Sequence, residues 1–130
     1  MDKDSAELTL KILKILDDKK ALELKALFVG ELTTVADYFV IASGTSTTHV
    51  KSLCDEVLER LAEEGVTVNH IEGYNSATWI LMDYGSIVVH IFTKDERNFY
   101  SLERLWGDAK GVICDVEERA KIVCFKTPTK

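Results

Sequence analysis

Two ionisable side chains, Asp83 and His90, lie in an otherwise apolar stretch and are the residues best suited to chemistry. The stretch, WILMDYGSIVVHIF over residues 79–92, predicts two strands joined by a two-residue turn at Gly85 and Ser86. Such a turn places Asp83 diagonally opposite His90, within about 8 Å between backbone positions. An Asp–His pair can activate a nucleophile, but this register puts no serine or cysteine beside it. A binding role or a structural role is therefore favoured over catalysis.

The predicted turn also sorts the hairpin side chains onto two faces. One face is nearly all apolar and is predicted to be core; it holds Ile80, Met82, Tyr84, Ile87, Val89 and Ile91. The other face mixes apolar and ionisable groups; it holds Trp79, Leu81, Asp83, Val88, His90 and Phe92. A helix could cover this mixed face, with Asp83 and His90 satisfying each other or the turn. Alternatively, part of it is open and binds a protein, because tryptophan beside hydrogen-bonding groups is typical of interface hot spots.

The segment GTST, residues 44–47, precedes a predicted helix and could hold a phosphate, since helix N-termini present free N–H groups. It lacks the second glycine and the lysine of a phosphate loop. A nucleotidyl-transfer site would also need paired carboxylates on the next strand to hold magnesium. That strand, VTVNHIE, offers only Glu72. An ordinary helix start, capped by Ser46 or Thr47, is the simpler interpretation.

The three histidines have no ligand spacing in common. His70 and Glu72 alternate onto one strand face, which supplies two ligands where a zinc site needs at least three. His49 at a helix start is more typical of local packing. We therefore expect neither a metal site nor a cofactor.

The elements that must position these residues follow from hydrophobic periodicity. Helices are predicted at 5–20, 47–64 and 94–108, and strands at 24–32, 37–43, 66–73 and both halves of 79–92. The continuous apolar run at 37–43 predicts a strand buried on both faces, hence central in a sheet. The strand–helix–strand step over 37–72 favours a parallel pair there, whereas the hairpin must be antiparallel. The prediction is one α/β domain with a mixed, mostly five-stranded sheet and flanking helices; KIVCF (122–126) is either an edge strand or part of an extension.

Composition limits the classes of function. The chain has 130 residues, 46% of them hydrophobic, which suits one domain with a sizeable core. A net charge of −6 disfavours direct, charge-driven or sequence-specific binding to nucleic acid and favours a basic protein partner. Three cysteines without a C-x-x-C pair indicate a reducing compartment. No signal-peptide pattern and no membrane-spanning run is visible, so we expect a cytoplasmic protein.

Several motifs together resemble the Iojap-related ribosomal silencing factor family, RsfS, over roughly residues 5–108. They are DYFVIASGTS (37–46), His49-Val50, Glu72-Gly73, Trp79, DYG (83–85), VHIF (89–92), Arg97, Tyr100 and LERLW (102–106). The resemblance implies a nucleotidyltransferase-like sheet without the active site, and a protein that is not an enzyme. It implies binding to ribosomal protein number fourteen of the large subunit, which blocks joining of the small subunit and represses translation when nutrients are limited. Thr48 stands where the family often has arginine, and a contact made by that arginine would be lost.

From the hairpin and the resemblance together we expect the partner-binding residues to be Trp79, Leu81, Asp83, Tyr84 and His90. Trp79 would be the apolar anchor, Asp83 a charge for the basic partner, and His90 a group that orients Asp83. Residues 1–110 would form the silencing domain and residues 111–130 an extension of unknown role. The alternative function is a small nucleotide-binding or nucleotidyl-transfer enzyme that uses GTST. Whether the free protein forms a homodimer stays open.

Overall fold

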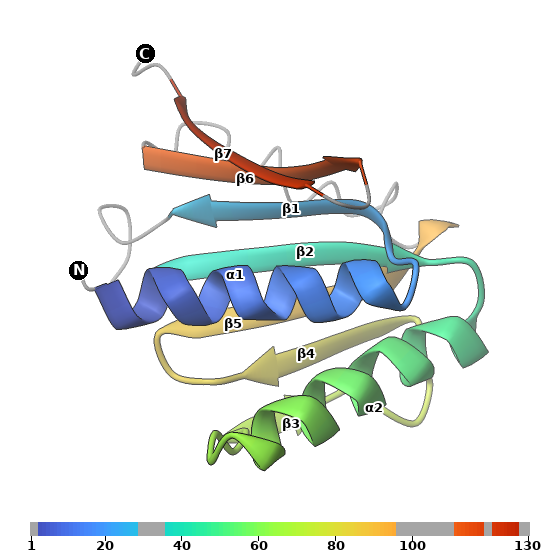
Figure 1. Ribbon diagram of the computed structural model, residues 1–130. Helices are drawn as coiled ribbons and strands as arrows, with labels where there is room; N and C mark the ends of the chain where they lie inside the picture. The colour runs from blue at the N-terminus through green and yellow to red at the C-terminus, as the bar shows by residue number, and fades with distance from the viewer. Residues whose placement is uncertain (1–2, 29–35, 96–110, 119–120, 128–130) are drawn as a thin grey trace.

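The computed structural model describes residues 3–28, 36–95, 111–118 and 121–127, and Figure 1 shows their arrangement. These residues form two helices, α1 (Lys3–Asp18) and α2 (Thr47–Glu63). The strands are β1 (Leu22–Phe28), β2 (Tyr38–Gly44), β3 (His70–Glu72), β4 (Trp79–Asp83), β5 (Ile87–Thr93), β6 (Gly111–Glu118) and β7 (Lys121–Thr127). All seven strands belong to one sheet, and both helices pack against it, so the predicted α/β class is confirmed.

The sheet is mixed, with the strand order β3-β4-β5-β2-β1-β6-β7. Neighbouring strands are antiparallel except for β2 and β5, which are parallel. The apolar strand β2 lies fourth of seven, in the centre, as its continuous hydrophobic run predicts. The prediction that β2 pairs in parallel with β3, the strand that follows α2, is wrong. That strand, β3, lies at the sheet edge with His70 and Glu72 exposed, and the fully apolar β5 takes the place beside β2.

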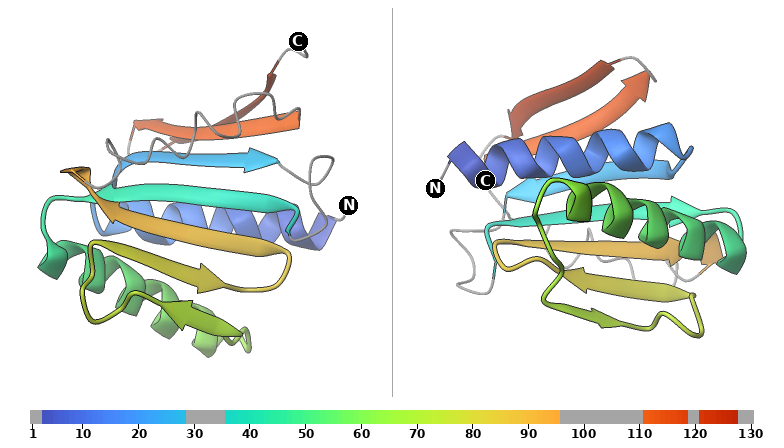
Figure 2. Two further views of the ribbon diagram at one scale, coloured as in Figure 1. Left: turned by 180° about the vertical axis from the view of Figure 1, so that it is seen from behind. Right: turned by 60° about the horizontal axis from the view of Figure 1, so that its bottom comes forward.

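Both helices cover the same face of the sheet, as the views in Figures 1 and 2 show. The main core lies between them and the sheet. It includes Ile12, Leu13 and Leu16 of α1, Val50, Leu53, Val57 and Leu61 of α2, and Ile80, Met82, Ile87, Val89 and Ile91 of the hairpin. All of these side chains are fully buried, which at about 25 cal/mol per Å² of apolar surface is the main source of stability.

The start and the end of α2 follow the predicted signals. Ser46 is the N-cap, and its side-chain oxygen accepts from the backbone N–H of His49 at 3.1 Å. After the helix, Gly65 has φ +83°, a left-handed conformation that suits glycine. The His49 ring bonds to the backbone N–H of Thr45 and to the carbonyl of Lys19, at 2.9 Å each. His49 therefore ties the helix start to the end of α1, which is the local packing role expected of it.

The last residues of the chain extend the sheet at the edge opposite β3 (Figure 1). β6 pairs with β1, and β7 pairs with β6 as the outermost strand. Of the two alternatives for KIVCF, the edge strand is the one observed, so the sheet has two strands more than the five predicted. The predicted helix at 94–108 falls almost wholly outside the described residues. No described helix has the length and apolar character needed to cross a bilayer.

Candidate partner-binding surface

The β4–β5 hairpin has the predicted register. Trp79 pairs with Phe92, Leu81 with His90, and Asp83 with Val88. Gly85 at the turn has φ +90°, which an L side chain rarely adopts, and this explains why glycine is needed there. The face predicted to be core is the one that α1 and α2 cover, so the assignment of residues to the two faces is confirmed.

The opposite face of the sheet carries a separate, smaller apolar cluster. Its buried members are Ala36, Phe39, Ile41, Val88 and Phe92, and the half-buried Trp79 and Leu81 pack against them. No residue of α1 or α2 belongs to this cluster, and both helices lie behind the sheet when this face is viewed (Figure 2, left). We call this surface, formed by the cluster together with Asp83 and His90, the second sheet face. Its β4 side is partly open to solvent, which is what a docking surface requires.

His90 lies in the middle of the second sheet face and is 5% exposed. Its Nδ1 accepts a hydrogen bond from the indole Nε1–H of Trp79 at 3.2 Å. The ring meets Phe39 edge-on at 5.0 Å between centroids and is stacked with Phe92 at 6.2 Å. Burial disfavours the charged imidazolium and lowers the pKa of His90 to about 4. His90 is therefore neutral at physiological pH.

Asp83 stands at the end of β4 and is half-buried. Its Oδ1 accepts from the backbone N–H of Gly85 at 2.8 Å, so the carboxylate stabilises the turn. Among the described residues, no hydrogen bond or ion pair joins Asp83 to His90. The observed partner of His90 is Trp79, and the proposed orienting role of His90 toward Asp83 has no contact to support it.

Tyr84 lies apart from the other four residues expected to bind a partner. Side chains alternate along the strand, so Tyr84 follows Met82 onto the helix-covered face, where it packs against the main core. Its hydroxyl is buried and has no hydrogen-bond partner within the described part of the chain. Burial, with a smaller contribution from Cys54, raises the pKa of Tyr84 to about 12. Trp79, Leu81, Asp83 and His90 come together on the second sheet face, but Tyr84 does not join them.

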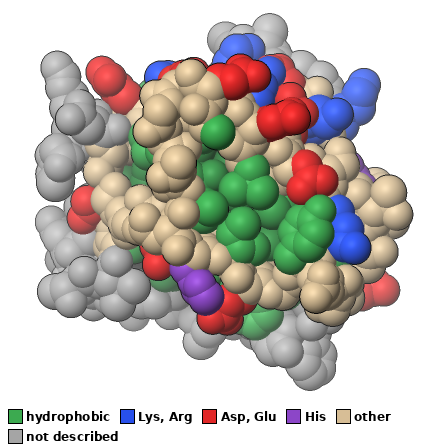
Figure 3. All heavy atoms as spheres, turned by 90° about the horizontal axis from the view of Figure 1, so that it is seen from below, with side chains coloured by type: hydrophobic (Ala, Val, Ile, Leu, Met, Phe, Trp, Pro, Cys, Tyr) green, Lys and Arg blue, Asp and Glu red, His purple; other side chains and the backbone are tan. Residues whose placement is uncertain are grey.

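The short edge strand β3 extends the second sheet face and was not predicted to belong to it. His70 pairs with Asp83, and Glu72 with Leu81, so both side chains lie on that face. They are exposed and bond to each other at 2.9 Å. The alternation of His70 and Glu72 along the strand is the sequence signal that could have indicated this shared face. Seen from this edge, histidine and acidic side chains lie beside an apolar patch between α2 and β3 (Figure 3).

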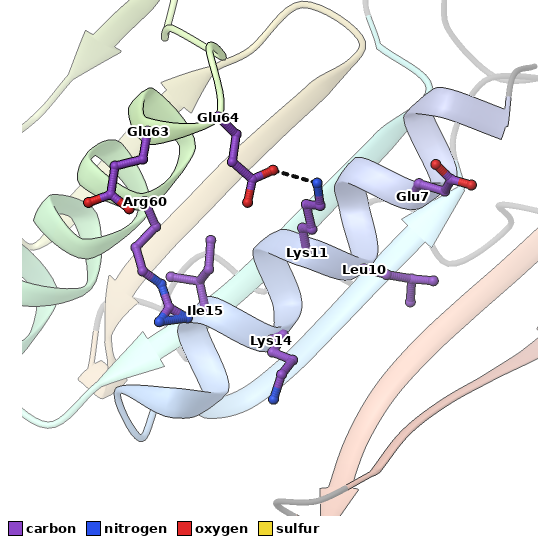
Figure 4. Close-up of a pocket in the computed structure, with 8 residues that line it drawn as sticks. All are labelled: Glu7, Leu10, Lys11, Lys14, Ile15, Arg60, Glu63 and Glu64. Atoms are coloured by element: carbon purple, nitrogen blue, oxygen red, sulfur yellow. Dashed lines mark hydrogen bonds and ion pairs between the residues drawn. The ribbon is translucent and has the colours of Figure 1, made fainter.

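A groove with a volume of roughly 680 Å³ lies between α1 and α2 (Figure 4). Leu10 and Ile15 lie in it, among three acidic and three basic side chains. Lys11 forms an ion pair with Glu64, and Arg60 bonds to Asp18 at 2.9 Å. The charges neutralise one another, so the groove has no excess charge with which to select a ligand.

Neither a metal site nor a phosphate site emerges from the described residues. Within those ranges, no three His, Cys, Asp or Glu side chains converge to hold an ion. The Ser46 hydroxyl of GTST is engaged by its own helix at the N–H of His49. GTST is thus an ordinary capped helix start in this structure.

Among the described residues, the protein is an α/β protein in which one mixed open sheet carries both helices on one face and a half-open apolar surface on the other. The family described as "Ribosomal silencing factor during starvation" matches residues 2–129, and the chain belongs to this family, RsfS. The predicted resemblance is confirmed, and the match continues through β6 and β7, beyond the region that the motifs covered.

Individual relatives agree with this placement. The chain is 45% identical to ribosomal silencing factor RsfS of Bacillus subtilis over 93 residues, which are 72% of this chain and 79% of the relative. It is 30% identical to chloroplastic protein Iojap of Arabidopsis thaliana over 122 residues, 92% of this chain and 50% of the relative. A solved structure from Bacillus halodurans is similar, with a TM-score of 0.69 and 36% identity, covering 81% of this chain and 95% of that one. Another, from Chromobacterium violaceum, has a TM-score of 0.73 and 32% identity, covering 82% and 88%.

Proposed function

We propose that this protein binds the large ribosomal subunit and sterically prevents the small subunit from joining, which represses translation when nutrients are limited. Its direct partner would be a basic ribosomal protein, number fourteen of the large subunit, and it would act in the cytoplasm without catalysis or a cofactor. The observation that carries the proposal is the second sheet face, where the half-buried Trp79 and Leu81 lie over a buried apolar cluster. Membership of the silencing factor family supports the ribosome as the target.

Electrostatics supports a basic partner. The chain carries a net charge of −6, and attraction between oppositely charged proteins speeds their encounter. At the β3 edge of the second sheet face, Glu72 is exposed and Asp83 is half-buried, so acidic groups border the apolar centre. An apolar centre with a charged rim is the usual composition of a transient protein interface.

We propose that the docking surface lies within the silencing domain, residues 1–110, and that residues 111–130 are an extension with a role separate from it. β6 and β7 form the sheet edge farthest from β3 and β4, which supports this division of roles. The same surface could pair two copies of the free protein, and partner binding would then compete with a homodimer.

A subunit-association assay tests the proposal. Steric blocking requires one molecule for each large subunit, so titration should reach its endpoint near a one-to-one ratio. Full inhibition at a small fraction of that ratio would indicate an enzyme instead. The alternative of a nucleotide-binding enzyme predicts magnesium-dependent nucleotide binding by the free protein, and Ser46→Ala would weaken it.

A further inference from the structure

The hydrogen bond between Trp79 and His90 connects the open side of the second sheet face to its buried centre. Trp79 is at the start of β4, beside the edge strand, and is half-buried. His90 is on β5 and is 5% exposed. The two are not directly paired across the hairpin, since Trp79 pairs with Phe92 and His90 with Leu81. The indole therefore reaches diagonally over the sheet to find this acceptor at 3.2 Å.

The bond defines the state of the imidazole. A nitrogen that accepts from an indole N–H carries no proton, so Nδ1 is the bare nitrogen and Nε2 carries the hydrogen. Nε2 is buried, and none of the described residues forms a hydrogen bond with it. Leaving a buried N–H unpaired costs free energy. Retaining histidine here, rather than an apolar side chain, thus has a cost that the Nδ1 bond must offset.

The surrounding aromatic rings hold this acceptor in one orientation. Phe39 packs edge-on against the imidazole, and the ring of Phe92 is nearly parallel to it, at 10° between ring planes. Phe92 also stacks with the indole of Trp79 at 5.0 Å between centroids. The indole is consequently held at its N–H by His90 and along its ring by Phe92. The hydrogen bond to His90 and the stacking with Phe92 together fix the orientation of the Trp79 ring relative to the sheet.

We propose that His90 is a positioning residue for docking, which holds the indole N–H of Trp79 inside the protein and so presents an apolar ring to the partner. The inference rests on the proposed function of the second sheet face. Because the indole N–H is already satisfied, the partner supplies no acceptor at this point, and the surface that covers Trp79 is apolar although the partner as a whole is basic.

Two substitutions at His90 separate the acceptor from the packing. His90→Phe keeps a buried ring but removes the acceptor, whereas His90→Asn places an amide oxygen close to the position of Nδ1. In ¹⁵N-labelled protein, the indole proton of Trp79 reports the bond directly. The other tryptophan, Trp106, is distinguished with Trp79→Phe. We expect His90→Phe to shift the Trp79 indole proton upfield and accelerate its exchange with D₂O, and His90→Asn to preserve both properties.

Affinity for isolated large subunits is then measured for the same variants. We expect His90→Phe to bind roughly threefold or more weakly, the fold-change of one ordinary hydrogen bond, and His90→Asn to bind like the parent. Unchanged affinity of His90→Phe with a shifted indole resonance would overturn the positioning role. So would an unchanged indole resonance in a folded His90→Phe.

If His90→Phe does not fold, His90→Asn alone tests the positioning role. A His90→Asn variant that keeps the parent's indole resonance but loses affinity for large subunits also contradicts the proposal. Failure of the proposed function would look different: the parent would not bind large subunits, or Trp79→Ala would bind as tightly as the parent.

Discussion

Strands β4 and β5 are joined by one turn and are both mostly apolar, yet they differ in what covers them. On β5, residues Ile87 to Phe92 are buried on both faces. On β4, only the residues that face the helices are buried, and Trp79, Leu81 and Asp83 on the other face are half-buried. The cause is position in the sheet, because β5 lies between β4 and β2, whereas β4 is next to a three-residue edge strand. Proximity to the edge turns the same kind of sequence from core into surface.

The largest expected effect contrasts two neighbours on β4. Ile80 is fully buried in the main core, so Ile80→Ala should lower the free energy of unfolding by about 2–5 kcal/mol. Leu81→Ala, on the half-open face, should cost about 1 kcal/mol or less. Urea denaturation of both variants measures the difference. Equal losses would mean that the second sheet face is as well packed as the helix-covered face.

Acid should destabilise the β5 side of the second sheet face. The pKa of His90 is about 4 in the folded protein and near 6.5 when unfolded, so between these values the unfolded chain binds the extra proton. Stability from neutral His90 is therefore complete above pH 6.5, falls as the pH decreases toward 4, and levels off below that. The loss is on the order of 3 kcal/mol.

Denaturation of the parent and of His90→Phe at several pH values isolates this contribution, because the other titrating groups are common to both proteins. The nearest charged residues in the same row of the sheet are Lys25 and Glu72, each two strands away from His90. Burial rather than a neighbouring charge is the cause of the shift. Parallel pH curves for the two proteins would show that His90 titrates normally.

Trp79 should matter for binding more than for folding. If it is a partly open anchor, Trp79→Ala should weaken binding to large subunits by about 2 kcal/mol or more and leave most of the melting temperature intact. Co-sedimentation and thermal denaturation measure the two effects. A collapse in stability without a specific loss of binding would place Trp79 with the β5 core.

Asp83 should give the smallest effect, on the rate of association. Asp83→Asn keeps an oxygen for the N–H of Gly85, so the turn remains, and removes only the charge. We expect slower association with a flatter dependence on salt, because rim charges act mainly through long-range attraction. Stopped-flow binding at two ionic strengths tests this. The same salt dependence in parent and variant would leave Asp83 with its turn-stabilising role alone.

The sequence predicted those features that local geometry determines. Gly85 and Ser86 permit one tight turn, and this register assigns every hairpin residue to its face. The sequence alone could not predict that β5 rather than β3 lies beside β2, nor that β6 pairs with β1. Both pairings depend on contacts between distant segments. Alternation likewise places Trp79 and His90 on one face but does not specify their hydrogen bond, which requires side-chain conformations. The expectation that Tyr84 binds the partner disagrees with its own alternation, which places it with Met82 on the helix-covered face.

The pairing of β1 with β6 has a consequence for the order of folding. Ala26 of β1 meets Cys114 of β6, so this contact closes a loop that includes most of the chain. Contacts so far apart in sequence form slowly, because closing a long loop costs entropy before any pairing energy is gained. During synthesis, β1 and β2 can associate early, but the outer edge of β1 stays unpaired until β6 has been translated. The newly made chain therefore carries an unprotected strand edge until residues 111–118 are available to cover it.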